Sequence, residues 1–66
     1  MTKSEAIKAI EEGKKVTHQW FSDEEFVKMS NEEGVYEFED GVKQLQEEFW
    51  KLRTDLSWLI DWEIKN

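Results

Sequence analysis

The residues best suited to bind a small molecule gather near the C-terminal end of the chain. Three of the four tryptophans lie there, with several polar side chains between them. An aromatic ring can stack on a nucleobase, which contributes roughly 1–3 kcal/mol per base, and polar groups can bind at the rim of the same site. The candidate ligand-binding residues of this segment are Trp50, Arg53, Thr54, Asp55, Trp58, Asp61 and Trp62.

The same tryptophans can also be explained as the core of a small domain. A chain of 66 residues buries only about 60% of its unfolded surface, so its stability is marginal. Each Trp or Phe can bury roughly 150–250 Å², and the sequence holds four of each. The two explanations are compatible, and the sequence leaves open whether the rings form the core or a binding surface.

No motif in the chain indicates catalysis. His18 is the only histidine, the residue type that most often serves as general acid or base, and no motif places a nucleophile or a second acid beside it. Glycines 13, 34 and 41 do not form a phosphate-binding loop. The absence of cysteine and the single histidine exclude thiolate and two-histidine metal sites within one chain. We therefore expect a non-enzymatic protein with no metal and no cofactor.

The charge is strongly acidic and unevenly distributed. The net charge is −7, and residues 21–48 hold ten carboxylates against two lysines. This excludes a general nucleic-acid binder, which needs a basic face to displace counterions. The acidic segment is either a solvated surface or a face that docks on a basic protein. The candidate protein-interaction residues are Glu32, Glu33, Glu37, Glu39 and Asp40.

Local signals divide the first two thirds of the chain into short elements. A capping box of Thr2 and Glu5 predicts a helix over about 3–12, ended by Gly13. Residues 15–18 read as a short strand, and residues 22–25 as a single helical turn. Residues 26–39 read as a hairpin, with Gly34 in its turn and Asp40-Gly41 as the next turn signal.

The C-terminal third admits two structures. Apolar residues at heptad spacing favour one long helix, whereas Trp58, Ile60, Trp62 and Ile64 alternate as in a strand. A helix there would be apolar nearly all round, and so small a domain could not bury it. The sequence therefore predicts a short helix over about 45–53 and a strand over about 58–64. The expected fold is α+β, a single domain of residues 1–66, with the N-terminal helix packed on an antiparallel sheet of about three to four strands.

The size and hydropathy of the chain also bear on its surroundings. No apolar run approaches the roughly 20 residues that a membrane span needs, and no basic run followed by an apolar stretch indicates a targeting signal. We expect a cytoplasmic protein that does not bind membranes. Domains this small often gain stability by self-association, so a homo-oligomer is plausible.

Two segments give the chain a family resemblance. The opening SEAIKAIEEGKKVTHQW and the ending TDLSWLIDWEIK resemble the corresponding ends of the second-type anti-Thoeris sponge family of phages. The resemblance implies a compact α+β domain that oligomerises in the bacterial host cytoplasm and sequesters cyclic ADP-ribose-type immune signals. It implies proximity to a pocket or interface for Trp20, Thr54, Asp55, Asp61 and Trp62.

The chain departs from that family in two respects. His18 and Gln19 stand where the family tends to carry an arginine, and the middle of the chain is shorter and far more acidic. A phosphate-bearing ligand would have to be met by Lys14, Lys15 and Arg53, together across subunits. Two hypotheses follow: sequestration of a nucleotide-derived immune signal, or direct inhibition of a host defence protein or nuclease by an acidic, anti-CRISPR-like or DNA-mimicking surface.

Overall fold

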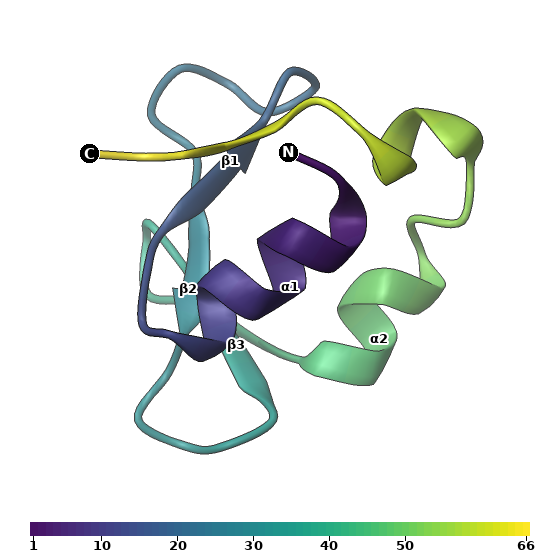
Figure 1. Ribbon diagram of the computed structural model, residues 1–66. Helices are drawn as coiled ribbons and strands as arrows, with labels where there is room; N and C mark the ends of the chain where they lie inside the picture. The colour runs from purple at the N-terminus through teal and green to yellow at the C-terminus, as the bar shows by residue number, and fades with distance from the viewer.

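The computed structural model describes residues 1–66 and has an α+β fold, as the sequence predicts (Figure 1). Its five strands form one antiparallel sheet in the order β4-β3-β2-β1-β5. The elements in chain order are α1 (Lys3–Glu11), β1 (Val16–His18), β2 (Val27–Met29), β3 (Val35–Phe38), β4 (Lys43–Leu45), α2 (Gln46–Lys51), the 3₁₀ helix η1 (Leu56–Leu59) and β5 (Trp62–Ile64).

Helix α1 begins and ends where its sequence signals predict. The Thr2 hydroxyl accepts from the Glu5 amide (3.2 Å), and the Glu5 carboxylate accepts from the Thr2 amide (2.8 Å), which completes the capping box. Gly13 has φ of 87°, a left-handed conformation that favours glycine and redirects the chain into β1. Ala6, Ala9 and Ile10 of the helix are buried against the sheet.

The predicted hairpin is present, and a second one follows it. Strands β2 and β3 pair Val27 with Phe38 and Met29 with Tyr36. The single turn over residues 22–25 is also present, closed by the Glu25 amide on the Ser22 carbonyl (3.1 Å). The pairing of β3 with β4 was not expected from the sequence, because Lys43-Gln44-Leu45 is too short and polar to read as a strand. The sheet therefore has five strands, one more than the three to four that the sequence predicts.

The C-terminal strand begins later than the sequence predicts. Residues 56–59 form η1, and only Trp62–Ile64 join the sheet, where β5 pairs with β1 along its whole length. The prediction of a strand from residue 58 was wrong because the His18 side chain binds the Ser57 and Ile60 carbonyls and holds this segment in a tight turn. The predicted helix over 45–53 is confirmed in a shorter form as α2.

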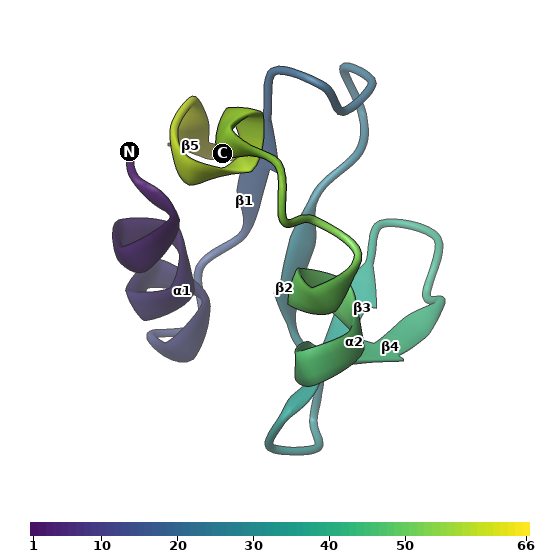
Figure 2. The ribbon, with the colours of Figure 1, turned by 90° about the vertical axis from the view of Figure 1, so that its right-hand side faces the viewer.

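Both helices cover the same face of the sheet and enclose the core (Figure 2). Helix α1 packs on β1, β2 and β5, while α2 packs on β3 and β4. The core residues are Ala6, Ala9, Ile10, Val16, Val27, Tyr36, Phe49, Trp50 and Trp62. None of the helices has the length and apolar character needed to cross a bilayer.

The opposite face of the sheet carries polar side chains. By strand alternation, Thr17 and Glu63 lie across from each other on β1 and β5, and Lys28 and Lys43 flank Glu37 on β2, β4 and β3. Opposite charges on neighbouring strands stabilise a sheet by a few tenths of a kcal/mol to about 1 kcal/mol per pair. This face has no helix over it (Figure 2), although the loop after β1 contacts it where the Thr17 hydroxyl donates to the Glu25 carbonyl.

Candidate functional site

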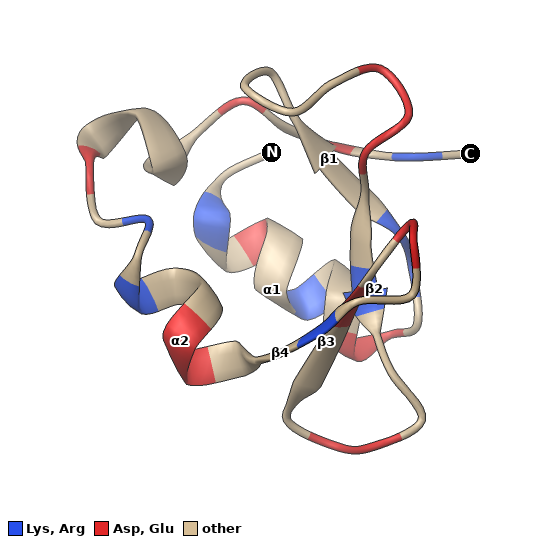
Figure 3. Cartoon of the chain, turned by 180° about the vertical axis from the view of Figure 1, so that it is seen from behind, with Lys and Arg blue, Asp and Glu red and all other residues tan.

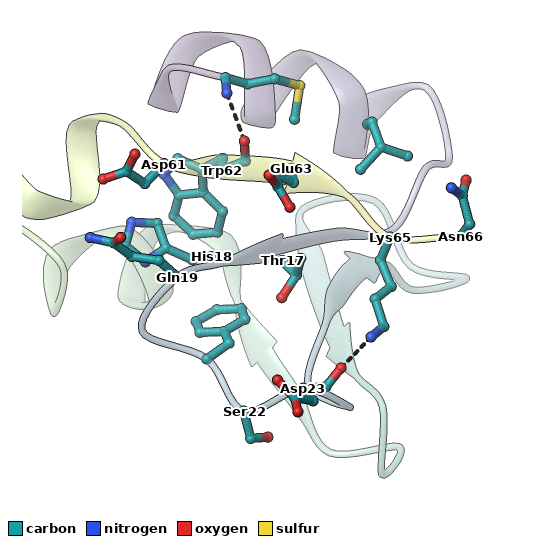
Figure 4. A pocket seen from close by; sticks show the side chains of 13 residues that line it. Thr17, His18, Gln19, Ser22, Asp23, Asp61, Trp62, Glu63, Lys65 and Asn66 are labelled. Carbon is teal, nitrogen blue, oxygen red and sulfur yellow. Dashed lines mark hydrogen bonds between the residues drawn. The ribbon is translucent and has the colours of Figure 1, made fainter.

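A hollow of about 610 Å³ lies over β1 and β5, on the face of the sheet without helices (Figure 4). We call it the β1/β5 groove. Its floor and walls come from β1, the loop that follows β1, and β5, with Met1 at the side. The residues that form its central part are Thr17, His18, Gln19, Asp61, Trp62 and Glu63.

Pairing of the two chain ends creates this groove. Thr17 lies opposite Glu63 and His18 opposite Trp62, although about 45 residues separate the partners in sequence. The Met1 nitrogen donates to the Trp62 carbonyl (2.6 Å), and the Trp62 amide donates to the Met1 carbonyl (3.1 Å). The segment before α1 therefore closes the free edge of β5 at this residue and contributes one wall.

The groove is rich in hydrogen-bond acceptors. Three carboxylate side chains, on Asp23, Asp61 and Glu63, line it together with one cationic side chain, Lys65. The Lys65 ammonium donates to the Asp23 carbonyl, which draws the loop after β1 towards β5 (Figure 4). The Thr17 hydroxyl already donates to the Glu25 carbonyl (3.0 Å), so it faces a ligand as an acceptor. Such a lining suits a ligand that presents hydroxyl and amino donors.

His18 forms part of the groove but is a structural residue. It is only 3% exposed, and its ring lies between Trp58 and Trp62, 4.4 and 4.7 Å between centroids. Nε2 donates to the carbonyls of Ser57 (2.9 Å) and Ile60 (2.8 Å), and Nδ1 accepts from the Trp20 amide (3.1 Å). This set of partners requires the neutral tautomer with its proton on Nε2, and both ring nitrogens are fully occupied.

Asp61 has an unusual backbone conformation at the end of the groove. Its φ is 69°, and it is the only residue other than glycine with a positive φ. The left-handed region is costly for L-residues and is tolerated best by Asn, Asp and Gly. The Gln19 amide donates to the Asp61 carbonyl (3.3 Å) and fixes this turn beside the end of β1. Such local strain is often found at functional sites.

The tryptophans divide between core and surface. Trp62 is fully buried and Trp50 nearly so, and their Nε1 atoms donate to the Trp58 carbonyl (2.8 Å) and the Tyr36 hydroxyl (2.9 Å). Neither ring presents a free face to a ligand, since each is enclosed by other aromatic rings. Trp58 is half-buried, whereas Trp20 is 65% exposed. Trp20 follows Gln19 directly and is therefore the tryptophan that a ligand at this end of the groove could stack on.

Three predicted site residues lie away from the groove, in the connection between α2 and η1. Thr54 and Asp55 are exposed there. The Arg53 guanidinium lies 3.9 Å from the Phe49 ring and donates through Nη1 to the Phe49 carbonyl (3.1 Å), while its buried Nε has no partner. Burial lowers the pKa of Arg53, and the charge of Glu25 opposes that shift. Of the predicted ligand-binding set, only Asp61 and Trp62 line the groove, with Trp20 at its margin.

The predicted acidic interaction residues do not form one surface (Figure 3). Glu32 and Glu33 lie in the turn between β2 and β3, whereas Glu39 and Asp40 lie in the turn between β3 and β4, at the other end of the hairpin. Glu37 lies between two lysines in the middle of the sheet. The sequence grouped these residues by proximity along the chain, and antiparallel pairing separates them.

Sequence reasoning missed the polar residues that line most of the groove. Thr17, Gln19, Asp23, Glu63 and Lys65 were not singled out, because nothing local shows that β1 and β5 pair. No cluster of acidic or histidine side chains is arranged to hold a metal ion. Comparisons with protein families, with curated proteins and with solved structures found no match to this chain.

Proposed function

We propose that this protein is a non-enzymatic, phage-type anti-defence protein that sequesters a nucleotide-derived immune signal in the β1/β5 groove. The proposal rests on which parts of the sequence supply the residues that line the groove. The two segments that resemble the sponge family are far apart in sequence, and their residues Thr17–Gln19 and Asp61–Lys65 supply most of the groove. Binding alone would remove the signal, without any chemical step.

The size of the groove and its hydrogen-bond acceptors suit the sugar part of such a ligand. Its volume of about 610 Å³ is within the roughly 300–1,000 Å³ typical of small-molecule sites. Carboxylates recognise ribose hydroxyls in dinucleotide-binding proteins, and Asp61 and Glu63 can play that part here. Lys65 is the cationic side chain within the groove and would lie beside a phosphate, while the exposed Trp20 ring offers a stacking surface for a base.

Thermal melts with a panel of cyclic nucleotides and cyclic ADP-ribose isomers test this proposal. A ligand at about 100 times its dissociation constant adds roughly 2.7 kcal/mol to the free energy of unfolding. In a domain of this size 1 kcal/mol moves the melting temperature by about 4–8 °C, so a true ligand should give a large shift. No shift with any compound of the panel would contradict the proposal.

Paired variants locate the site within the protein. Asp61→Asn with Glu63→Gln removes two groove carboxylates, and Asn keeps the left-handed backbone tolerable. Glu47→Gln with Glu48→Gln removes two exposed carboxylates from α2 and serves as the charge-matched control. The ligand-induced shift should be lost in the first pair and kept in the second. Equal loss in both pairs would mean that general charge, rather than the groove, governs binding.

A second function, direct inhibition of a host defence protein, is favoured by a different observation. The Phe26 amide donates to the Glu39 carboxylate (3.3 Å), which brings the turn containing Asp40 beside the loop containing Asp23 and Glu24. The resulting acidic end could dock on a basic nuclease surface. Its binding should weaken steeply with salt and be lost with Glu39→Gln and Asp40→Asn. Binding that is indifferent to salt would count against it.

A further inference from the structure

Three lysines lie side by side on the face of the sheet that no helix covers. Lys65 lies opposite Lys15, whose carbonyl accepts from the Lys65 amide (2.9 Å). On the other side of β1, the pairing of Val16 with Val27 places Lys15 opposite Lys28 at the next step of the antiparallel register. Residues directly opposite each other in a sheet share a face. The three side chains therefore form one row across β5, β1 and β2, which we call the lysine row.

The lysine row begins inside the β1/β5 groove and continues beyond it. Side chains two residues apart in a strand lie on the same face, so Lys15 and Lys65 lie beside Thr17 and Glu63, which line the groove. Figure 4 shows the side chains of Thr17 and Lys65 on the same side of the two strands. Lys65 is itself a groove residue, whereas Lys15 and Lys28 extend the row past the groove wall.

The row concentrates positive charge in an acidic protein. It holds three of the nine basic residues of a chain whose net charge is −7. Glu37 lies opposite Lys28 and ends the row, but the one ion pair of the protein joins Lys14 and Glu12 (3.4 Å). Lys15 therefore has a like charge on each side and no carboxylate partner. Like charges directly opposite each other destabilise a sheet, so folding alone does not favour this arrangement.

Two of the three ammonium groups are held on the groove side of the row. The Lys15 ammonium lies 4.8 Å from the centre of the Phe26 ring, and the register of β1 with β2 places Phe26 opposite Thr17. The Lys65 ammonium donates to the Asp23 carbonyl and keeps two further N–H groups. Neither contact neutralises a charge, because a ring and a backbone carbonyl carry no net charge. Both cations are therefore positioned and still able to bind an anion.

The chemistry and the surroundings of the row fit a phosphate group. Lysine is a common phosphate ligand, and neighbouring strands lie about 4.8 Å apart, so ammonium groups on adjacent strands can reach the same phosphate or pyrophosphate. The next row of side chains on this face limits the size of the anion, because it carries Glu63 beside Thr17 and Glu39 beside Phe26. A nucleic acid or an anionic membrane surface would extend over these carboxylates and be repelled.

We propose that the lysine row binds the phosphate or pyrophosphate group of a nucleotide whose sugar lies in the β1/β5 groove. The inference rests on the proposed function and extends its site from β1 and β5 to β2. It supplies positive charge that the groove lacks, since three carboxylate side chains line the groove against one cationic side chain. Of the three cations that the sequence predicted to meet a phosphate, only Lys15 belongs to the row; Lys14 pairs with Glu12, and Arg53 is stacked on the Phe49 ring.

Backbone amide chemical-shift mapping with inorganic pyrophosphate tests the row without a nucleotide. Saturable shifts should be largest at the amides of Lys15, Lys28 and Lys65, and added salt should weaken the binding. Lys15→Gln with Lys28→Gln should weaken it by about five- to tenfold. Lys8→Gln with Lys51→Gln, which removes two exposed lysines from α1 and α2 and therefore the same amount of charge, should leave it unchanged.

The absence of a saturable response to pyrophosphate would overturn the inference, and so would equal weakening in the two double variants. The nucleotide panel separates this test from that of the proposed function. If a compound of the panel binds Lys15→Gln with Lys28→Gln as tightly as the wild type, the row is not part of the site, while the proposed function stands. If pyrophosphate binds at the row and no compound of the panel binds, the phosphate site is supported and the proposed function is contradicted.

Discussion

Replacement of His18 tests the hydrogen bonds by which its ring joins β1 to η1 and to the loop after β1. His18→Ala removes the donor to the Ser57 and Ile60 carbonyls and the acceptor of the Trp20 amide. It also leaves a space between two tryptophan rings. A buried unsatisfied group costs roughly 1–3 kcal/mol, and the lost packing raises the total to about 3–5 kcal/mol.

That loss is large for this protein. At about 0.05–0.15 kcal/mol per residue, a chain of 66 residues has a free energy of unfolding of about 3–10 kcal/mol. His18→Ala should therefore be unfolded or close to it at room temperature. His18→Gln can place its amide nitrogen near the position of Nε2 and keep the donor to the carbonyls. It loses the acceptor of the Trp20 amide, which costs about 1–2 kcal/mol, and part of the packing between the two tryptophan rings.

Urea denaturation and thermal melts followed by tryptophan fluorescence measure both variants. His18→Gln should lower the melting temperature by about 4–16 °C, and His18→Ala should show no cooperative transition. The wild-type protein provides the reference, and Gln19→Ala, which changes the neighbouring exposed side chain, controls for effects on the loop. If His18→Ala unfolds within about 1 kcal/mol of the wild type, the ring does not hold η1 in place and this reasoning is refuted.

Three further predictions concern groups outside the groove. Burial raises the pKa of Tyr36 above its usual value of 10.0, and the hydrogen bond from Trp50 partly opposes the shift. The contribution of Tyr36 to stability should therefore be complete below pH 10 and decline above it. Urea melts should show a smaller decline at alkaline pH in Tyr36→Phe than in the wild type. Thr2→Ala should lower stability by about 1 kcal/mol. The backbone amide of Thr2, and to a smaller extent its hydroxyl, lower the pKa of Glu5 from 4.5, so their stabilisation is present above that pH and lost as the pH falls below it. The variant keeps the amide bond and loses the hydroxyl, so an acid titration should show a slightly weaker dependence. Arg53→Met should stay within about 1 kcal/mol of the wild type or be more stable in urea melts, because it removes a partly desolvated charge and keeps the packing stem; a loss of several kcal/mol would show that the guanidinium is essential to the fold.

The parts of the fold that depend on local signals could be predicted from the sequence. The capping box at Thr2, the left-handed turns at Gly13 and Gly34, and the alternation in β3 each act within a few residues. The fold class follows from these elements. The short polar strand β4 was missed, because its place in the sheet comes from the turn at Gly41 and from pairing with β3 rather than from its own residues.

The C-terminal segment could not be derived from local pattern. Trp58, Ile60 and Trp62 alternate as in a strand, but His18, some 40 residues earlier, binds this segment and imposes a 3₁₀ turn. The left-handed conformation of Asp61 arises in the same way, at the junction between η1 and β5. Long-range hydrogen bonds decided the structure here, and propensity could not anticipate them.

The candidate site was predicted only in part. The sequence pointed to aromatic rings and to Asp61, yet most of the rings fill the core, as expected for a domain with few other large apolar residues. The groove itself depends on the register between β1 and β5, which brings Thr17 to Glu63. A residue's role in such a site becomes visible only when its partner strand is known.

Backbone amide chemical-shift mapping during titration with the active compound of the nucleotide panel tests the central claim most directly. The account predicts that the largest shifts fall on Thr17, His18 and Gln19 of one segment and on residues 61–65 of the other, with Trp20 at the margin. The chemical shifts of the β4 and α2 amides should not change. Shifts centred on α2 or η1, or no saturable shift with any compound, would contradict the assignment of the β1/β5 groove as the binding site.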